Sequence, residues 1–168
     1  RFRISEWMLR AMELTQIAAS SMATEKHAII CGYGRSGQYL ARFLEQEGVS
    51  YVALDLDPER VREAAAAGDT VVYGDAARRE ALVAAGLMRA SVLIVSYADA
   101  DSALRVLALV RALRPELPVV VRAVDESDFA RLSQGGAAEV VPEVLEASTM
   151  LASHALVLLG VPINRGVR

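Results

Sequence analysis

Cysteine, lysine and histidine are scarce in this sequence, and each scarcity excludes a kind of chemistry. The one cysteine, Cys31, cannot form an intrachain disulfide, and its place at the end of an apolar run indicates a small core residue. The one lysine, Lys26, precedes every glycine-rich turn, which excludes a P-loop. The two histidines, His27 and His154, lack the spacing of zinc ligands and pair with no nucleophile. We therefore expect no metal site and no enzymatic activity.

Excess positive charge and long apolar runs are also lacking. The net charge of −3 and the pI near 5.5 argue against a nucleic-acid partner, which usually requires a basic face. No segment has the ~18 uncharged apolar residues of a membrane span, and no signal peptide is evident. The 168 residues fit one soluble, cytosolic domain. The start at Arg1 rather than Met leads us to expect a piece of a longer protein.

Three glycines form the motif around which the rest is organised. Gly32, Gly34 and Gly37 stand at G-x-G-x-x-G spacing, between the apolar run His27–Cys31 and a helical pattern. The first glycine permits a tight turn, the second lets the backbone approach a pyrophosphate, and the third lets the helix pack closely on the strand. The start of the helix adds free N–H groups and positive partial charge. The motif therefore predicts a nucleotide-phosphate site.

Strand and helix patterns alternate from the glycine motif onward. The predicted strands are His27–Cys31, Tyr51–Asp55, Thr70–Tyr73, Ser91–Val95, Pro118–Arg122 and Glu139–Val141. The predicted helices cover Ser36–Glu47, 58–67, Arg78–Ala85, a helix through Leu113, Glu126–Gln134 and 143–159. Either Asp101 or Asp99 caps the helix that runs through Leu113. This alternation predicts an α/β, doubly wound parallel sheet with right-handed crossovers. Six strands with the glycine motif after the first predict the Rossmann-like order 3-2-1-4-5-6.

The two ends of the chain do not fit this alternation. Residues 1–25 form a roughly amphipathic pattern, which indicates either a helix packed on the domain or a second copy, or a linker helix from a membrane domain. The domain itself covers 26–160, and 161–168 is a tail. Its last helix is apolar on several faces, so it should pack on the sheet or cross to a partner chain.

Ligands of this fold bind at the carboxyl ends of the strands. Asp55 lies there, about 20 residues past the glycines, where a carboxylate accepts hydrogen bonds from an adenosine ribose. That carboxylate would repel a 2′-phosphate, so NAD(H) or an adenine nucleotide is favoured over NADP(H). Asp75 could either reach the adenine amino group or cap the next helix. These two readings of Asp75 stay open.

Three more polar residues lie at the same edge. Ser96 could bind phosphate or ribose, or could be an ordinary turn residue. Arg35 could hold an anion or remain solvated. Arg122 follows one proline and three valines, and a guanidinium leaving a buried strand needs an anionic partner or a wet cleft.

Four runs together resemble the RCK N-terminal domain, also known as TrkA-N. They are Ala28–Gln38, Leu54–Pro58, Tyr73–Ala76 and Val121–Ala123. The nearest likeness is to the soluble domain of Kef-type (monovalent cation:proton antiporter-2) potassium systems. The resemblance implies a domain that binds NAD(H), AMP, ADP or ATP without turning it over. It also implies a homodimer formed through the last helix, on the cytoplasmic side of a membrane transporter to which residues 1–25 are the tether.

The resemblance also implies residue roles. Glycine-turn residues would hold phosphates, Asp55 the ribose, and Asp75 with Ala76 the adenine, while Ser96 lines the site and Arg122 lies near the dimer face. The expected cofactor-binding set is Gly32, Tyr33, Gly34, Arg35, Ser36, Gly37, Asp55, Leu56, Asp75, Ala76, Ser96 and Arg122.

Two other functions compete with this one. An NAD-dependent oxidoreductase fragment would need a substrate domain and a catalytic acid or base. A dimerising scaffold with an empty cleft would bind no nucleotide. The missing substrate domain and the apolar last helix favour the regulatory domain over both.

Overall fold

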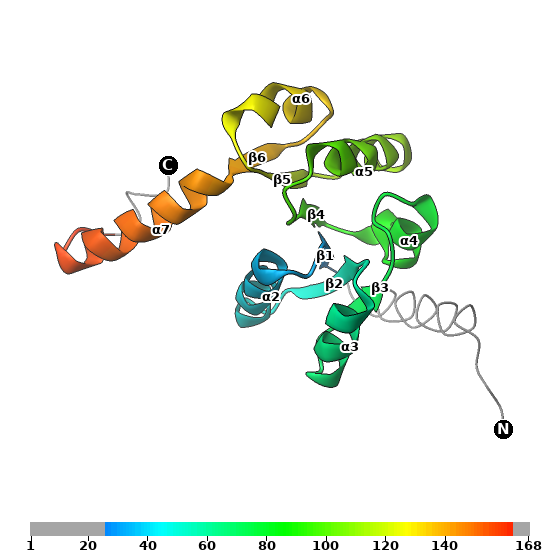
Figure 1. Ribbon diagram of the computed structural model, residues 1–168, viewed down its shortest axis with the longest axis horizontal. Helices are drawn as coiled ribbons and strands as arrows, with labels where there is room; N and C mark the ends of the chain where they lie inside the picture. Colours follow the sequence, from blue (N-terminus) through cyan, green and yellow to red (C-terminus); the bar gives the residue numbers. More distant parts are fainter. Residues whose placement is uncertain (1–25, 163–168) are drawn as a thin grey trace.

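The computed structural model describes residues 26–162 as a six-stranded parallel sheet in the order β3-β2-β1-β4-β5-β6 (Figure 1). The strands are β1 His27–Cys31, β2 Ser50–Asp55, β3 Val71–Tyr73, β4 Val92–Val95, β5 Val119–Ala123 and β6 Glu139–Pro142. The predicted fold class and strand order are therefore confirmed. The predicted helix in residues 1–25 and the end of the predicted tail lie outside the described residues.

Helices follow the strands as the alternation predicts. They are α2 Arg35–Gln46, α3 Pro58–Ala66, α4 Arg79–Ala84, α5 Ala100–Leu113, α6 Phe129–Gln134 and α7 Glu143–Leu158, with 3₁₀ turns η1 Leu87–Arg89 and η2 Glu126–Asp128. The prediction missed η1, and it merged η2 with α6 into one helix. Asp125 lies before both and caps the start of η2, where its side chain accepts the Ser127 N–H at 2.9 Å.

Local capping explains where two of the helices start. Asp57 caps α3 by accepting the Glu59 N–H at 3.0 Å, and Pro58 follows at the first helical position. Asp99 caps α5 by accepting the Ser102 N–H at 3.1 Å. Both caps lie just beyond the carboxyl end of a strand, so they bring the helix starts to the ligand edge of the sheet.

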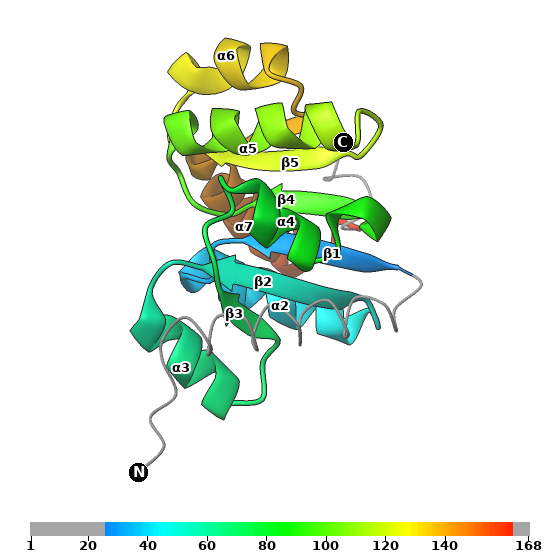
Figure 2. The ribbon, with the colours of Figure 1, turned by 90° about the vertical axis from the view of Figure 1, so that its right-hand side faces the viewer.

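Two hydrophobic cores lie on opposite faces of the sheet (Figures 1 and 2). The larger core packs α4, α5 and α6 against the inward-facing residues of β1, β2, β4 and β5, and the smaller one packs α2 and α3 against β1, β2 and β3. Cys31 is fully buried in the larger core, and burial raises its pKa to about 12. The expectation of an inert core cysteine is therefore confirmed.

The last helix, α7, stands apart from both cores. None of its residues is buried, and it projects from the β6 end of the sheet on the side where α2 lies (Figures 1 and 2). The sequence left two options, packing on the sheet or on a partner chain. Within the described residues, α7 contributes no buried side chain to its own sheet.

Candidate functional site

A cavity of about 1010 Å³ opens at the carboxyl ends of β1, β2 and β4. Every residue of the expected cofactor-binding set lines it except Tyr33, namely Gly32, Gly34, Arg35, Ser36, Gly37, Asp55, Leu56, Asp75, Ala76, Ser96 and Arg122. Five parts of the sequence therefore meet in one place. Sequence reasoning missed several other lining residues, of which Gln38, Arg60, Ser102 and Glu143 carry polar groups.

The glycine turn forms one wall of this cavity. Gly32 has a φ of +98°, and its N–H donates to the Leu54 carbonyl at 2.8 Å. A Cβ on Gly37 would lie 2.1 Å from the Gly32 oxygen, so the helix can only approach the turn with glycine there. A Cβ on Gly34 would meet no atom closer than the Arg60 Cζ at 4.0 Å. Gly34 therefore leaves open space for a ligand rather than for protein packing.

Helix α2 begins at this turn without a side-chain cap. Gly34 is its N-cap residue, and its first turn contains no acidic residue. The first N–H groups of a helix have no intrahelical acceptors, and the helix dipole adds positive partial charge there. The start of α2 is therefore suited to an anionic group such as a phosphate.

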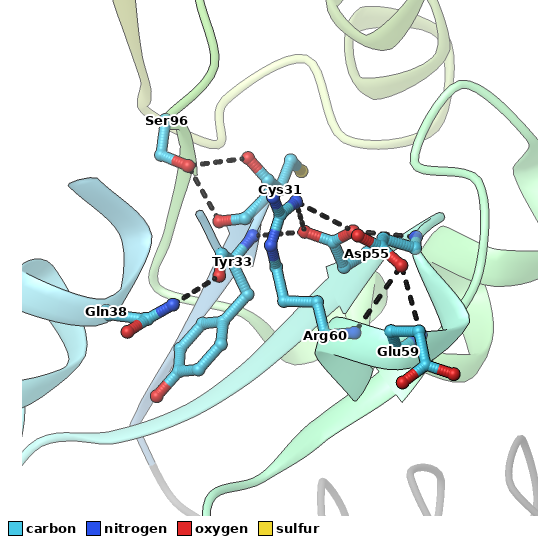
Figure 3. A network of polar contacts seen from close by, with 9 residues as sticks. Cys31, Tyr33, Gln38, Asp55, Glu59, Arg60 and Ser96 are labelled. Atoms are coloured by element: carbon cyan, nitrogen blue, oxygen red, sulfur yellow. Dashed lines mark hydrogen bonds and ion pairs between the residues drawn. The ribbon is translucent and has the colours of Figure 1, made fainter. Parts of the chain in front are cut away.

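Asp55 is held in place opposite the glycine turn (Figure 3). One carboxylate oxygen accepts the Tyr33 N–H at 2.7 Å, and the other accepts the Asp57 N–H at 2.8 Å. The Arg60 guanidinium completes the set, with Nη1 3.2 and 3.4 Å from the two oxygens. Asp55 is buried, so these donors supply the solvation that water would otherwise give. It is not merely a helix cap, since Asp57 caps α3.

Tyr33 differs from its neighbours because its side chain points away from the cavity. Its hydroxyl donates to Asp69 at 2.8 Å and accepts from Arg42 at 2.9 Å, and its ring stacks on Tyr51. Burial, more than the hydrogen bonds, raises the pKa of this phenol. Tyr33 contributes to the site only through its backbone, whose carbonyl accepts from Gln38 at 3.1 Å. A role for Tyr33 in ligand binding therefore stays a prediction for its backbone rather than for its side chain.

The Ser96 hydroxyl stabilises the glycine turn through hydrogen bonds. Its hydroxyl lies 2.7 Å from the Gly32 carbonyl and 3.1 Å from the Cys31 carbonyl, to which it donates (Figure 3). The turn role weighed in the sequence is therefore present, and the oxygen still lines the cavity. The next residue, Tyr97, shares a hydrogen bond of 2.9 Å with Ser102, and burial raises its pKa to about 12.

Asp75 does not have the capping role that was one of its two readings. Its carboxylate accepts the Ala77 N–H at 2.9 Å, which closes a turn after β3. It does not cap α4, whose N-cap residue Arg78 receives no side-chain cap. The capping alternative is therefore wrong, and the carboxylate remains at the cavity wall, where an adenine contact stays a prediction.

Arg122 has the anionic partner that its position on a buried strand requires. Its Nη2 lies 2.7 Å from Glu143, and its Nε lies 3.4 Å from Glu146, both in the first turn of α7. Its Nη1 also donates to the Ser96 carbonyl at 3.4 Å. Arg122 and Glu143 both line the cavity, so the base of α7 forms part of the site.

Within the described residues, the cavity lining includes no histidine and no cluster of metal ligands. Between residues 26 and 162, no three His, Cys, Asp or Glu side chains are placed to hold a metal ion. His27 lies at the far end of β1 from the glycine turn, with Nε2 3.3 Å from the Ala85 carbonyl. Burial lowers its pKa despite that hydrogen bond. The site therefore offers binding groups for an anionic, polar ligand.

Comparison with known proteins places this arrangement in a family. The family described as the TrkA-N domain matches residues 28–143. A protein of Alkalimonas amylolytica that carries the name of a K(+) efflux antiporter, KefB, is 47% identical over 141 residues. Glutathione-regulated potassium-efflux system protein KefC of Cronobacter sakazakii is 36% identical over 137 residues. These alignments cover 84% and 82% of this chain but only 21% and 22% of the relatives. The chain thus spans about a fifth of their length.

A solved structure supports the same grouping. The Kef CTD of Shewanella denitrificans in its AMP bound form is 32% identical and superimposes with a TM-score of 0.66. The match covers 83% of this chain and 85% of that one. The similarity therefore extends over nearly the whole of a separately solved domain.

Proposed function

The chain belongs to the TrkA-N family, and from that premise we propose that it is a regulatory nucleotide-binding domain of a Kef-type potassium transport protein. Its cleft takes NAD(H), AMP, ADP or ATP and does not turn the ligand over. One observation supports this proposal most directly. A single cavity is lined by the uncapped start of α2, by Gly34 with open space beside it, and by the buried Asp55.

Each part of the cavity suits one part of an adenine nucleotide. Phosphates match the N–H groups at the start of α2, because these carry positive partial charge and lack acceptors. The ribose matches Asp55, which lines the cavity, and the base matches the wall at Asp75 and Ala76. The related Kef CTD of S. denitrificans, solved with AMP, supports an adenine nucleotide over other phosphate compounds.

The parent protein is proposed to be a membrane transporter for potassium and protons. The named relatives are potassium-efflux proteins about five times the length of this chain. No helix in the described part of the chain is long and apolar enough to cross a membrane. We place the domain on the cytoplasmic face, with residues 1–25 as its tether.

A second copy of the chain is proposed to cover α7 and the neighbouring sheet face. Leu151 and Leu158 of α7 are 73% and 89% exposed, which is costly for a 16-residue helix in water. On the α2 side of the sheet, Val92, Ile94 and Val120 are only half-buried. An exchanged α7 would cover this apolar strip in each copy, because the helix emerges on the same side.

Arg122 connects the proposed ligand site with α7, the helix of the proposed dimer interface. It lies at the cavity wall and pairs with Glu143 and Glu146 at the base of α7. A phosphate near Arg122 would compete with these carboxylates, so ligand binding would bias the position of α7. A ligand moves a gate only through a different affinity for its two states, and this competition supplies that difference.

The nucleotide proposal is tested by Gly34→Asp, with Gly34→Ser as the matched control. Gly34 has negative φ and is an N-cap, so either residue should fold and cap α2. Only aspartate adds a negative charge where the phosphates are proposed to bind. We expect AMP or NADH at ~100 times its Kd to stabilise the wild type by ~2.7 kcal/mol, and Gly34→Asp to lose this.

Thermal unfolding with NADH, NAD, NADPH, AMP and ATP measures the effect. No shift with any nucleotide in the wild type would leave the dimerising scaffold as the better function. Oxidation of NADH on addition of a substrate would instead support the oxidoreductase fragment.

The dimer proposal is tested by Leu151→Asp, with Thr149→Asp on the opposite side of α7 as the control. A charge at Leu151 would be buried without a partner in the proposed interface. Analytical ultracentrifugation should show a dimer for the wild type and the control, and a monomer for Leu151→Asp. A monomeric wild type at high micromolar concentration would refute the dimer but leave the nucleotide site untouched.

A further inference from the structure

The ribose end of the cavity carries a positive group that the sequence pattern did not reveal. Arg60, in the first turn of α3, places its Nη1 3.2 Å from Asp55 Oδ2 and lines the cavity (Figure 3). Its side chain is 41% exposed, so the guanidinium can move without unpacking the core. The subsite is therefore an acidic and a basic residue side by side, not a lone carboxylate.

This pairing changes the charge that a 2′-phosphate would meet. With Asp55 alone, the ribose subsite has a charge of −1 and repels a second phosphate. With Arg60 beside it, the two charges cancel. An acidic residue at this point is typical of NAD sites, and an arginine nearby is what accommodates the 2′-phosphate of NADP. This chain has both residues in contact.

The hydrogen bonds of Asp55 also favour a 2′-phosphate at this subsite. Each of its oxygens already accepts one backbone N–H, from Tyr33 or Asp57, and Arg60 occupies part of the remaining capacity. A ribose hydroxyl must share or displace the Arg60 contact to reach Asp55. A displaced guanidinium then needs a new anionic partner, and the 2′-oxygen is where such a partner would be attached.

On the assumption that the proposed nucleotide function holds, we infer that Arg60 makes the ribose subsite accept a 2′-phosphate, so that NADP(H) binds as well as NAD(H). This revises the preference expected from Asp55 alone. The two other acidic residues at the start of α3 have partners of their own. Asp57 is engaged by backbone N–H groups at the α3 N-terminus, and Glu59 is paired with Arg62 at 2.8 Å.

Two ligands that differ only in the 2′-phosphate isolate this subsite. Isothermal titration calorimetry would compare AMP with adenosine 2′,5′-bisphosphate, and NADH with NADPH. The variants are Arg60→Met, the charge-conserving Arg60→Lys, and the control Arg62→Met, whose residue lies on the same helix outside the cavity. Circular dichroism melting confirms that each variant is folded before titration.

We expect the wild type and Arg62→Met to bind the bisphosphate within about tenfold of AMP. Arg60→Met should weaken the bisphosphate about tenfold or more relative to AMP, since a charge-assisted contact to the 2′-phosphate alone is lost. Arg60→Lys should retain part of the bisphosphate affinity.

Two results would overturn the inference. If the wild type binds AMP but binds the bisphosphate more than tenfold less tightly, Asp55 alone decides the preference. If Arg60→Met weakens both ligands equally, Arg60 serves the shared part of the nucleotide. Binding of neither ligand would instead remove the proposed function itself, together with this inference.

Discussion

The two faces of the sheet are built differently, and β4 displays the contrast in consecutive residues. Leu93 and Val95 are fully buried under the helices that follow, whereas Val92 and Ile94, which point the other way, are half-buried. The same alternation continues in β5. Helices α4, α5 and α6 cover the first face. On the second face, α2 and α3 cover only β1, β2 and β3.

The polar content of the two cores differs as well. The larger core consists of apolar side chains and cysteine, whereas the smaller one includes Tyr33 and Tyr51, whose hydroxyls join a network with Asp69 and Arg42. A sheet face that is fully covered by helices of its own chain stabilises the fold without a second chain. The half-covered face carries the polar network, and the glycine turn and the exposed α7 lie on the same side. Such a face is suited to exchanging contacts with a ligand or a second chain.

The sharpest test of this contrast is a pair of substitutions in one strand, Leu93→Ala and Ile94→Ala. Leu93→Ala should reduce the free energy of unfolding by about 2–5 kcal/mol, because it leaves a cavity in a finished core. Ile94→Ala should cost about 1 kcal/mol in dilute solution, since its side chain is only half-buried. Urea denaturation at low micromolar concentration measures both.

Protein concentration then separates the two faces further. If a second copy covers Ile94, the cost of Ile94→Ala should grow with protein concentration, because association stabilises the folded wild type. The cost of Leu93→Ala should not change. Equal costs for both residues at every concentration would show that the faces are equally complete and would contradict the comparison.

A smaller effect is expected from Tyr33→Phe in the polar core. The change removes one hydroxyl that donates to Asp69 and accepts from Arg42, while the direct Arg42–Asp69 pair at 2.6 Å remains. The free energy of unfolding should fall by about 1 kcal/mol, the usual value of one hydrogen bond. Tyr39→Phe, at an exposed position of α2, is the control and should have no measurable effect.

The same variant also tests the orientation of this side chain. Because the ring points away from the cavity, Tyr33→Phe should change AMP affinity less than threefold by calorimetry. A large loss of affinity without loss of stability would place the phenol in the binding site and contradict this orientation.

Much of the fold could be predicted because strand and helix patterns alternate without interruption. Apolar runs such as His27–Cys31 mark buried parallel strands, and the Asp57-Pro58 pair marks a helix start. The glycine motif after the first of six strands then favours the Rossmann strand order. The short turn Leu87–Arg89 could not be predicted, since three residues show no periodicity.

The site was predicted less completely, because its contacts join residues that no spacing rule connects. Asp55 follows from its distance to the glycines, but its partner Arg60 is recognised only when the loop brings α3 back over the strand. The direction of the Tyr33 side chain likewise depends on the turn geometry at Gly32. Arg122 was recognised as needing an anion, although the sequence did not identify Glu143 and Glu146.

The smallest expected effect concerns pH and the buried His27, which lies in the half of the molecule away from the ligand. Burial lowers its pKa in the folded state, and the nearby Arg89 adds to this, while the Ala85 carbonyl partly opposes it. The unfolded histidine has a pKa near 6.5, so below that value the unfolded chain binds more protons than the folded one. Stability should therefore fall as the pH drops through about 6.5, by less than about 1 kcal/mol between pH 7 and pH 6.

His27→Gln should flatten this part of the urea-denaturation profile, whereas His154→Gln, at an exposed position of α7, should not. An unchanged slope in His27→Gln would mean that groups other than this histidine set the pH dependence.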